Sequence, residues 1–372
     1  MNLFLWYAFV SIIFLFGGAL QYVGLLTPTE TNFVLIALGS LLVVANARSL
    51  GFGFLCLFFS VLFVLIIGYF NGSSSRSVVV YIYYVVCCFV ALCLGRAFYR
   101  KSPSSVHQKA LLFFMVAQAV VTTIQSVVVG RYSEGAQESD LVSGTLFLNS
   151  DATLVACMSL FVIFVFAKAG SLFDKLLVIL VALAVVTNCS SKAGELVFYI
   201  VAICLLASLF VIRLPRQLLF FFIGGSLLSA LMFYFVDAYE LVISFIYRAI
   251  DGYNFVEYGE RASRFAPIGQ FFSEGVTLYG DGYLTYYDPV NKSWLYDSGL
   301  GTYYSLIIDA GVVAAAFCFV FFLWLALRIK NRLYAILVFL IFFSYSFFNF
   351  GLSDMAFMFA YSFVTVGLYE NT

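Results

Sequence analysis

Two arginines three positions apart, Arg261 and Arg264, lie in a polar stretch of the chain at residues 237–298. If residues 260–266 form a helix, both side chains share one face of it. Two guanidinium groups on one face can hold two phosphates, and fixed cations stabilise the charge that develops on a pyrophosphate leaving group. The alternative is a pair of solvated arginines balanced by neighbouring acidic residues, Glu257, Glu260 and Glu274.

Two further cations, Lys192 and Arg131, lie in other polar segments. Lys192 lies in the turn at 188–195 between two apolar runs, and Arg131 opens the polar segment at 130–151. Lys192 can bind a substrate phosphate as a point charge, but a lysine at a membrane interface can also extend its charged end to lipid headgroups. Segment 130–151 has two readings, a plain loop with a helix cap or a substrate-facing loop.

Glycines and acidic residues complete the candidate site. Gly280, Asp281 and Gly282 follow one another in the polar stretch, and glycines let a backbone approach a ligand closely. An acceptor hydroxyl that attacks a donor needs a group to take its proton. The candidates by position are Asp297, Asp281 and Glu260.

The elements that position these residues are predicted to be membrane helices. The chain is 64% hydrophobic and 10% charged, with a mean hydropathy of +1.05, whereas about a quarter of the residues in soluble domains are charged. Its long continuous apolar runs are typical of membrane helices and not of β-barrel strands. We predict an all-α polytopic protein with one membrane domain over residues 1–372 and twelve spans, at 3–26, 32–47, 51–70, 77–95, 109–130, 152–168, 173–188, 194–212, 217–236, 299–325, 333–349 and 354–369.

The polar stretch 237–298 falls between the ninth and tenth predicted spans, and one acidic residue lies inside the tenth. Asp309 follows the start of that span by about ten residues, which is roughly 15 Å along a helix. A carboxylate at that depth is costly, so it is either functional or hydrogen-bonded in a way that fixes helix packing.

Lysine and arginine are concentrated in alternate loops. The positive-inside rule assigns the richer set to the cytoplasm, which places both chain termini inside and the 237–298 loop outside. An outward site has no access to cytoplasmic ATP or nucleotide sugars, so we expect a lipid-linked, already activated substrate. His107, the one histidine, is expected at the cytoplasmic surface. The richer set is Arg48, Arg96, Arg100, Lys101, Lys109, Lys168, Lys175, Arg213, Arg216, Arg328, Lys330 and Arg332.

Several function classes are disfavoured. A net charge of zero without a basic face argues against nucleic-acid binding. The eight cysteines lack metal-ligand spacing and are expected to pack as small hydrophobic residues, so neither a metal nor another cofactor is predicted. The sequence lacks an internal repeat, which disfavours a transporter or flippase, although that class stays an alternative.

Five segments, taken in order, resemble the O-antigen polymerase and ligase superfamily. Segment 144–152 is similar to that family's loop leading into a helix, and 187–194 to its Ser-Arg-Gly turn, with Lys192 where arginine is usual. The other three are similar to the arginine-bearing start of the large-loop helix, the Gly-x-Gly that follows, and the segment that re-enters the membrane, at 259–265, 280–282 and 297–312.

The resemblance implies an inverting, metal-independent glycosyltransferase at the periplasmic face of a bacterial inner membrane. Donor and acceptor would be undecaprenyl-pyrophosphate-linked glycans, and a chain-length regulator and a flippase would be partners in the pathway. It implies that Arg264 and Arg261 hold the pyrophosphate, with Lys192 as a third cation and Arg131 as a fourth. Ligases of the superfamily use a histidine in the large loop; the absence of one here favours a polymerase, with a ligase as the alternative.

Overall fold

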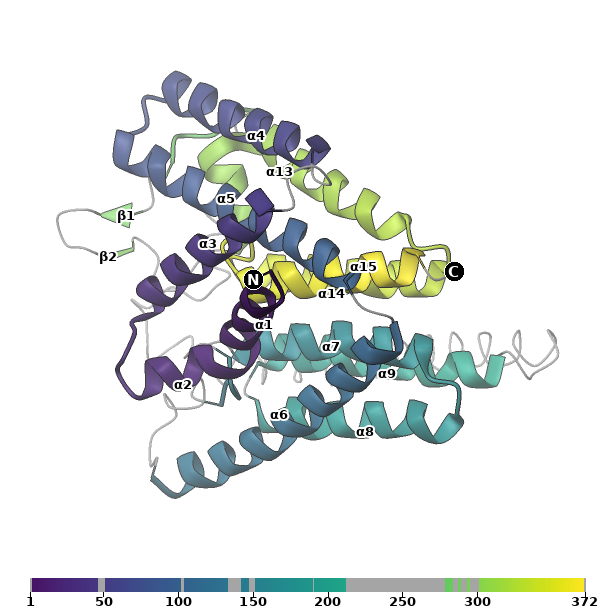
Figure 1. Cartoon of the computed structure of the whole chain (residues 1–372). Coiled ribbons are helices and arrows are strands. Elements are labelled where there is room, and N and C mark those ends of the chain that lie inside the picture. Colours follow the sequence, from purple (N-terminus) through teal and green to yellow (C-terminus); the bar gives the residue numbers. More distant parts are fainter. Residues whose placement is uncertain are drawn as a thin grey trace, which may run out of the picture.

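The computed structural model describes residues 2–45, 51–101, 104–132, 142–146, 151–189, 191–211, 278–283, 287–288, 293–294 and 301–370. Helices make up most of this part of the chain (Figure 1). In chain order the elements are α1 (Asn2–Ser11), the π-helix η1 (Ile12–Phe16), α2 (Gly17–Tyr22), α3 (Pro28–Ala45), α4 (Gly51–Phe70), α5 (Ser75–Tyr99), α6 (Ser104–Tyr132), α7 (Asp151–Lys168), α8 (Leu172–Asn188), α9 (Lys192–Val211), β1 (Tyr287–Asp288), β2 (Ser293–Trp294), α13 (Thr302–Leu327), α14 (Arg332–Phe348) and α15 (Met355–Glu370).

Helices occupy every predicted apolar run within the described residues, so the all-α class is confirmed for that part of the chain. The run at 217–236 and most of the loop at 237–298 lie outside it. The β structure in the described part is one antiparallel ladder, β1 with β2. The helices form because long stretches of leucine, phenylalanine, valine and alanine are interrupted only at the turns.

Four of the described helices are long and apolar enough to cross a membrane. They cover Ser75–Tyr99, Ser105–Val128, Asp151–Lys168 and Ser305–Leu327, with mean hydropathies between 1.9 and 2.6. Large apolar side chains also cover the outside of the bundle, on α4, α6 and α13. Phe58, Phe113 and Phe317 are 62%, 72% and 73% exposed. An apolar exterior of this kind is suited to lipid and costly in water.

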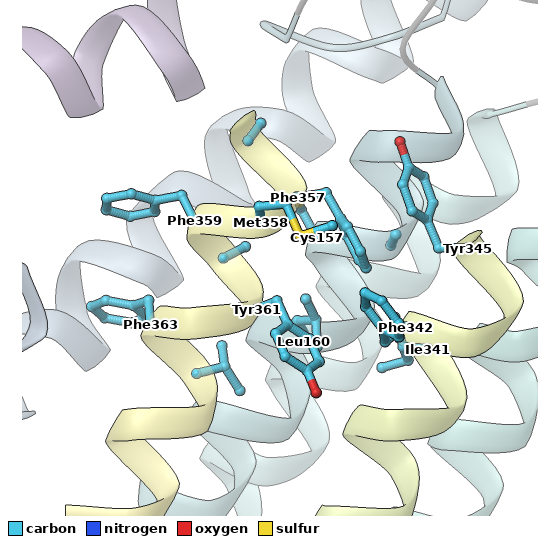
Figure 2. Close-up of a cluster of buried hydrophobic side chains, with 14 of the residues drawn as sticks. Cys157, Leu160, Ile341, Phe342, Tyr345, Phe357, Met358, Phe359, Tyr361 and Phe363 are labelled. Carbon is cyan, nitrogen blue, oxygen red and sulfur yellow. The ribbon is translucent and has the colours of Figure 1, made fainter. Parts of the chain in front are cut away.

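Helices α7 and α15 lie at the centre of the bundle, with α4 at one edge and α8 at the opposite edge (Figure 1). Figure 2 shows the core where α7, α14 and α15 meet, with Cys157 and Leu160 from α7 beside the rings of Phe342, Phe357 and Tyr361. All five side chains are buried, and the Tyr361 hydroxyl donates to the Phe322 carbonyl at 2.7 Å. Cys157 is a free thiol packed as a small hydrophobic residue, as expected.

The first predicted span contains a π-helical turn that accepts hydrogen bonds from a neighbouring loop. Between α1 and α2 the helix widens into η1, and a π turn frees backbone groups from the regular α pattern. The carbonyl of Phe14 accepts from the Thr145 hydroxyl at 2.5 Å and from the Gln118 amide at 3.4 Å. Thr145 belongs to the 142–146 segment, so this turn anchors part of the loop that leads to α7.

The expectation that His107 lies at the surface was wrong. His107 is 4% exposed, its ring stacks on Tyr99 with centroids 5.4 Å apart, and its Nε2 lies 3.0 Å from the Tyr99 carbonyl oxygen. The predicted helix began at Lys109, whereas α6 begins at Ser104. The histidine therefore belongs to the first turn of a helix, on the side that faces α5 and α15.

Candidate functional site

The predicted site residues divide into three groups. Arg261, Arg264 and Asp297 lie outside the described residues. Arg131 is in the last turn of α6 and Lys192 is the first residue of α9; the structure describes their backbones and not their side chains. Gly280, Asp281 and Gly282 are described, and they lie at a well-defined contact between a short segment and the bundle.

The 278–283 segment packs against a break in α13. At Gly311 the backbone of α13 is not helical, with φ 84° and ψ 173°. The N–H of Asp281 donates to the Ile308 carbonyl at 2.7 Å. The side-chain amide of Asn71, in the turn between α4 and α5, donates to the Tyr279 carbonyl at 2.6 Å and reaches the Asp309 carbonyl at 3.4 Å. The inserted segment and Asn71 thus satisfy carbonyl groups next to the break.

Glycine is required on both sides of this contact. Gly280 has φ +80°, and a β carbon there would lie less than 3.0 Å from the backbone of Asp309. A β carbon on Gly311 would lie less than 3.0 Å from the carbonyl of Leu278. Two backbones can approach this closely only where neither carries a side chain. The Gly-Asp-Gly sequence is therefore explained here by backbone packing against α13, with Asp281 exposed at its centre.

A buried carboxylate lies beside this contact. Asp309 is 0% exposed and accepts a hydrogen bond from the Tyr81 hydroxyl. Tyr283 stacks on Tyr81 with centroids 4.1 Å apart, and its hydroxyl donates to the Val64 carbonyl at 3.0 Å. The N–H of Tyr283 donates to Ser73 Oγ at 2.9 Å. Asp309 is thus hydrogen-bonded at a point where α4, α5 and α13 meet, which is the packing role considered from the sequence.

Tyr283 acts in this contact as a neutral hydroxyl. Burial raises the pKa of its phenol well above the ordinary value, and the nearby Asp309 carboxylate raises it further. The phenol therefore keeps its proton and serves as a donor to Val64. This keeps the 278–283 segment attached to α4 as well as to α13.

A second polar cluster lies at the same end of the bundle and consists of Thr153, Tyr345 and Asp354. The Oδ2 atom of Asp354 accepts from Thr153 Oγ1 at 2.5 Å and from the Tyr345 hydroxyl, and its Oδ1 accepts from the Phe357 N–H at 3.0 Å. The last bond caps the first turn of α15. One carboxylate therefore joins the start of α7, the end of α14 and the start of α15.

A small cavity opens beside this cluster, between α7, α9 and α14. Its volume is about 20 Å³, enough for one water molecule. Small side chains and glycine line most of it, and its polar lining residues are Ser159, Ser191, Ser344, Tyr345 and Asn349. The lining includes Ser191, Ala193 and Gly194, which belong to the turn that carries Lys192. The sequence motif at 187–194 thus contributes one wall of a cavity.

The start of α13 is attached to the turn that precedes α15. The N–H and the hydroxyl of Thr302 both donate to the Asn349 carbonyl, at 3.1 and 3.0 Å, and the Gly351 N–H donates to the Thr302 hydroxyl at 2.7 Å. Asn349 also lines the cavity. The segment that follows Asp297 in the chain, the turn at 349–351 and the turn bearing Lys192 therefore meet at one end of the bundle.

A row of aromatic rings connects the two polar clusters. Tyr283 stacks on Tyr81. The ring centroids of Tyr81 and Tyr84 are 5.6 Å apart, and those of Tyr84 and Phe350 are 4.6 Å apart. Phe350 follows Asn349 directly. The row places the 278–283 segment and the cavity at the same end of the helices. Packed aromatic pairs of this kind stabilise a fold beyond the contribution of the apolar area that they bury.

Sequence reasoning missed Thr153, Tyr345, Asn349 and Asp354. The composition of the turn at 350–354 did not indicate a functional site. The only one of the four that could have been recognised is Asp354, which precedes an apolar run and is therefore a candidate N-cap. Chemically, the cluster consists of a carboxylate and hydroxyl groups, and the Asp354 carboxylate is already engaged by Thr153, Tyr345 and the Phe357 N–H. Among the described residues, no three histidine, cysteine or acidic side chains are grouped to hold a metal ion.

Comparison with known proteins gives no independent assignment. No protein-family model matches the chain, and no curated protein matches it.

Proposed function

We propose that the chain is a membrane glycosyltransferase that polymerises undecaprenyl-pyrophosphate-linked oligosaccharide repeat units at the periplasmic face of a bacterial inner membrane. The proposal includes twelve spans, cytoplasmic termini and an outward loop at 237–298. One observation carries it. Three segments that the sequence assigns to the outer side come together at one end of the bundle. The turn of Lys192 and Asn349 line one cavity, and the start of α13 is hydrogen-bonded to the turn at 349–351.

In this proposal the cations hold the donor. Arg264 and Arg261 bind the pyrophosphate, with Lys192 and Arg131 as further positive charges. Lys192 begins α9, so the unpaired amides of the first helical turn add a partial positive charge at the same point. The same first turn also contains Glu195, whose carboxylate accepts from the Tyr199 hydroxyl at 2.6 Å and offsets part of this positive charge, so Lys192 is proposed to act together with the arginines and not alone.

The reaction is a displacement at the anomeric carbon. The acceptor hydroxyl oxygen forms a bond to that carbon as the bond to the pyrophosphate oxygen breaks, and the configuration inverts. The electron pair leaves with the pyrophosphate, where the arginines stabilise it. The hydroxyl proton goes to a carboxylate, for which Asp297 is proposed because it precedes the anchored start of α13 by only a few residues.

The test is reconstitution with a lipid-linked repeat unit. Purified protein in proteoliposomes is expected to convert single repeats into a ladder of longer glycans. Arg264→Ala should abolish the ladder, while Arg332→Ala, on the opposite side of the bundle, should keep it at matched protein amount. An unchanged ladder in Arg264→Ala refutes the pyrophosphate role. The absence of any ladder from the parent protein refutes the polymerase.

A transporter is the second candidate, and one observation favours it. Transporters place interrupted helices beside their substrate sites, and α13 is interrupted at Gly311 next to the buried Asp309. The same proteoliposomes decide between the two functions. A transporter moves labelled lipid-linked sugar between leaflets without lengthening it. A ligase, the third alternative, transfers glycan only when a lipid A acceptor is supplied.

A further inference from the structure

Three arginines come together at the opposite end of the bundle from the candidate site. Arg96 and Arg100 lie one turn apart at the end of α5, and Arg328 follows α13. The Nε of Arg100 donates to Glu370 Oε1 at 2.7 Å, which joins α5 to α15. Arg96 interacts electrostatically with Arg100, Arg328 and Glu370. We call Arg96, Arg100 and Arg328 the arginine cluster.

Arg328 lies over the ring of one aromatic side chain and near that of a second. Its guanidinium carbon lies 4.2 Å from the ring centroid of Trp324 and 5.9 Å from that of Tyr369. Stacking fixes the plane of a guanidinium group while its N–H edge still points outward. Trp324 and Tyr369 are 45% and 44% exposed, so this edge lies at the surface of the bundle.

Positive charge exceeds negative charge at this point. Within the described residues, Glu370 is the one carboxylate in an ion pair with the arginine cluster. The ends of α5, α13 and α15 add partial negative charge, roughly half a charge per helix. That offsets part of the positive charge. Three exposed cations nearby add to it again, Lys101 and Lys330 in the adjoining turns and Arg332 at the start of α14. A cluster of this kind favours an anionic ligand.

The position of the cluster identifies the kind of anion. Arg96 is near the end of the apolar helix Ser75–Tyr99, and Arg328 follows the apolar helix Ser305–Leu327. Tryptophan and tyrosine at such helix ends are typical of the level of the lipid headgroups. We infer that the arginine cluster binds the phosphate of an anionic phospholipid in the leaflet at this end of the bundle. This inference does not depend on the proposed enzymatic function.

Lipid retention on the purified full chain tests the inference. Protein in detergent is incubated with phosphatidylglycerol or with phosphatidylcholine, and retained lipid is counted by native mass spectrometry. Phosphatidylglycerol should be retained in preference. The double variant Arg96→Gln/Arg328→Gln should weaken its retention roughly thirtyfold, because each basic residue near an anionic surface contributes about a fivefold factor. Arg100 is left unchanged because its pair with Glu370 joins two helices.

A matched control removes two cations elsewhere on the same side. Lys109→Gln/Lys175→Gln alters the net charge equally, but retention should fall much less than in the arginine variant, because neither lysine belongs to the arginine cluster. Equal retention of the two lipids, or unchanged retention in the arginine variant, overturns the inference. Displacement of phosphatidylglycerol by millimolar inorganic phosphate also overturns it, because the cluster would then be a site for soluble phosphate.

Discussion

Gly280→Ala is expected to destabilise the protein strongly, because the 278–283 segment would no longer fit against α13. Gly280 has φ +80°, a conformation that costs an alanine about 1–2 kcal/mol. The new β carbon would lie less than 3.0 Å from the Asp309 backbone, so the segment must move away from the helix. That movement breaks the bond from the Asp281 N–H to the Ile308 carbonyl, at a further cost of about 1–3 kcal/mol for groups left unpaired. The expected total is roughly 2–5 kcal/mol.

The assay is equilibrium unfolding in mixed micelles, with two glycine controls. Gly72 also has a positive φ, +61°, but a β carbon there meets nothing within 4 Å. Gly72→Ala therefore measures the conformational cost alone, about 1–2 kcal/mol. Gly170→Ala has neither a positive φ nor a neighbour within 4 Å and should be nearly neutral. If Gly280→Ala costs no more than Gly72→Ala, the backbone contact with α13 contributes nothing and the argument for this contact is refuted.

Three other outcomes are expected. Tyr81→Phe removes a donor to the buried Asp309 and should lower the free energy of unfolding by about 1.5–3 kcal/mol. Tyr69 is 84% exposed, so the control Tyr69→Phe should change it by less than about 0.5 kcal/mol. Equal effects of the two substitutions would contradict the hydrogen bond between Tyr81 and Asp309. Asp354→Asn exchanges an acceptor of several hydrogen bonds for a group with fewer lone pairs, so unfolding in the same micelles should show a loss of about 1–3 kcal/mol. Lys192→Ala should shorten the glycan ladder in proteoliposomes while Lys192→Arg keeps it, and a normal ladder from the alanine variant would remove Lys192 from the proposed site.

The helices were predictable from the sequence because their signal is local. A continuous apolar run specifies a membrane helix without reference to the rest of the chain. The run predicted at 51–70 coincides with α4, and the runs at 152–168 and 173–188 differ from α7 and α8 by one residue at the start. The starts of α5 and α6 differ by more, because polar residues such as Ser104 extend a helix beyond its apolar part.

The contacts that build the candidate site could not be predicted, because they join residues far apart in the chain. Tyr81 and Asp309 are 228 positions apart, and Thr153 and Asp354 are 201 apart. The span at 299–325 was expected to be continuous, and only an isolated glycine at 311 suggested the break that the structure shows. Asp309 was recognised because a charge inside a span is costly, but its partner Tyr81 carried no signal of its own.

The attachment of the 278–283 segment fixes the chain to the bundle at a point well before the start of α13. Tyr283 is fixed to α4 and to the turn after it, and Gly301 lies against the backbone of Phe347. Residues added between these two anchors lengthen only the stretch that joins them and leave both anchors in place. Because closing a longer loop costs only about 0.6 kcal/mol for each doubling of its length, the stretch between the two anchors can vary among related chains at little cost. Insertions and deletions should therefore accumulate between Tyr283 and Asp297 and spare the 278–283 segment itself.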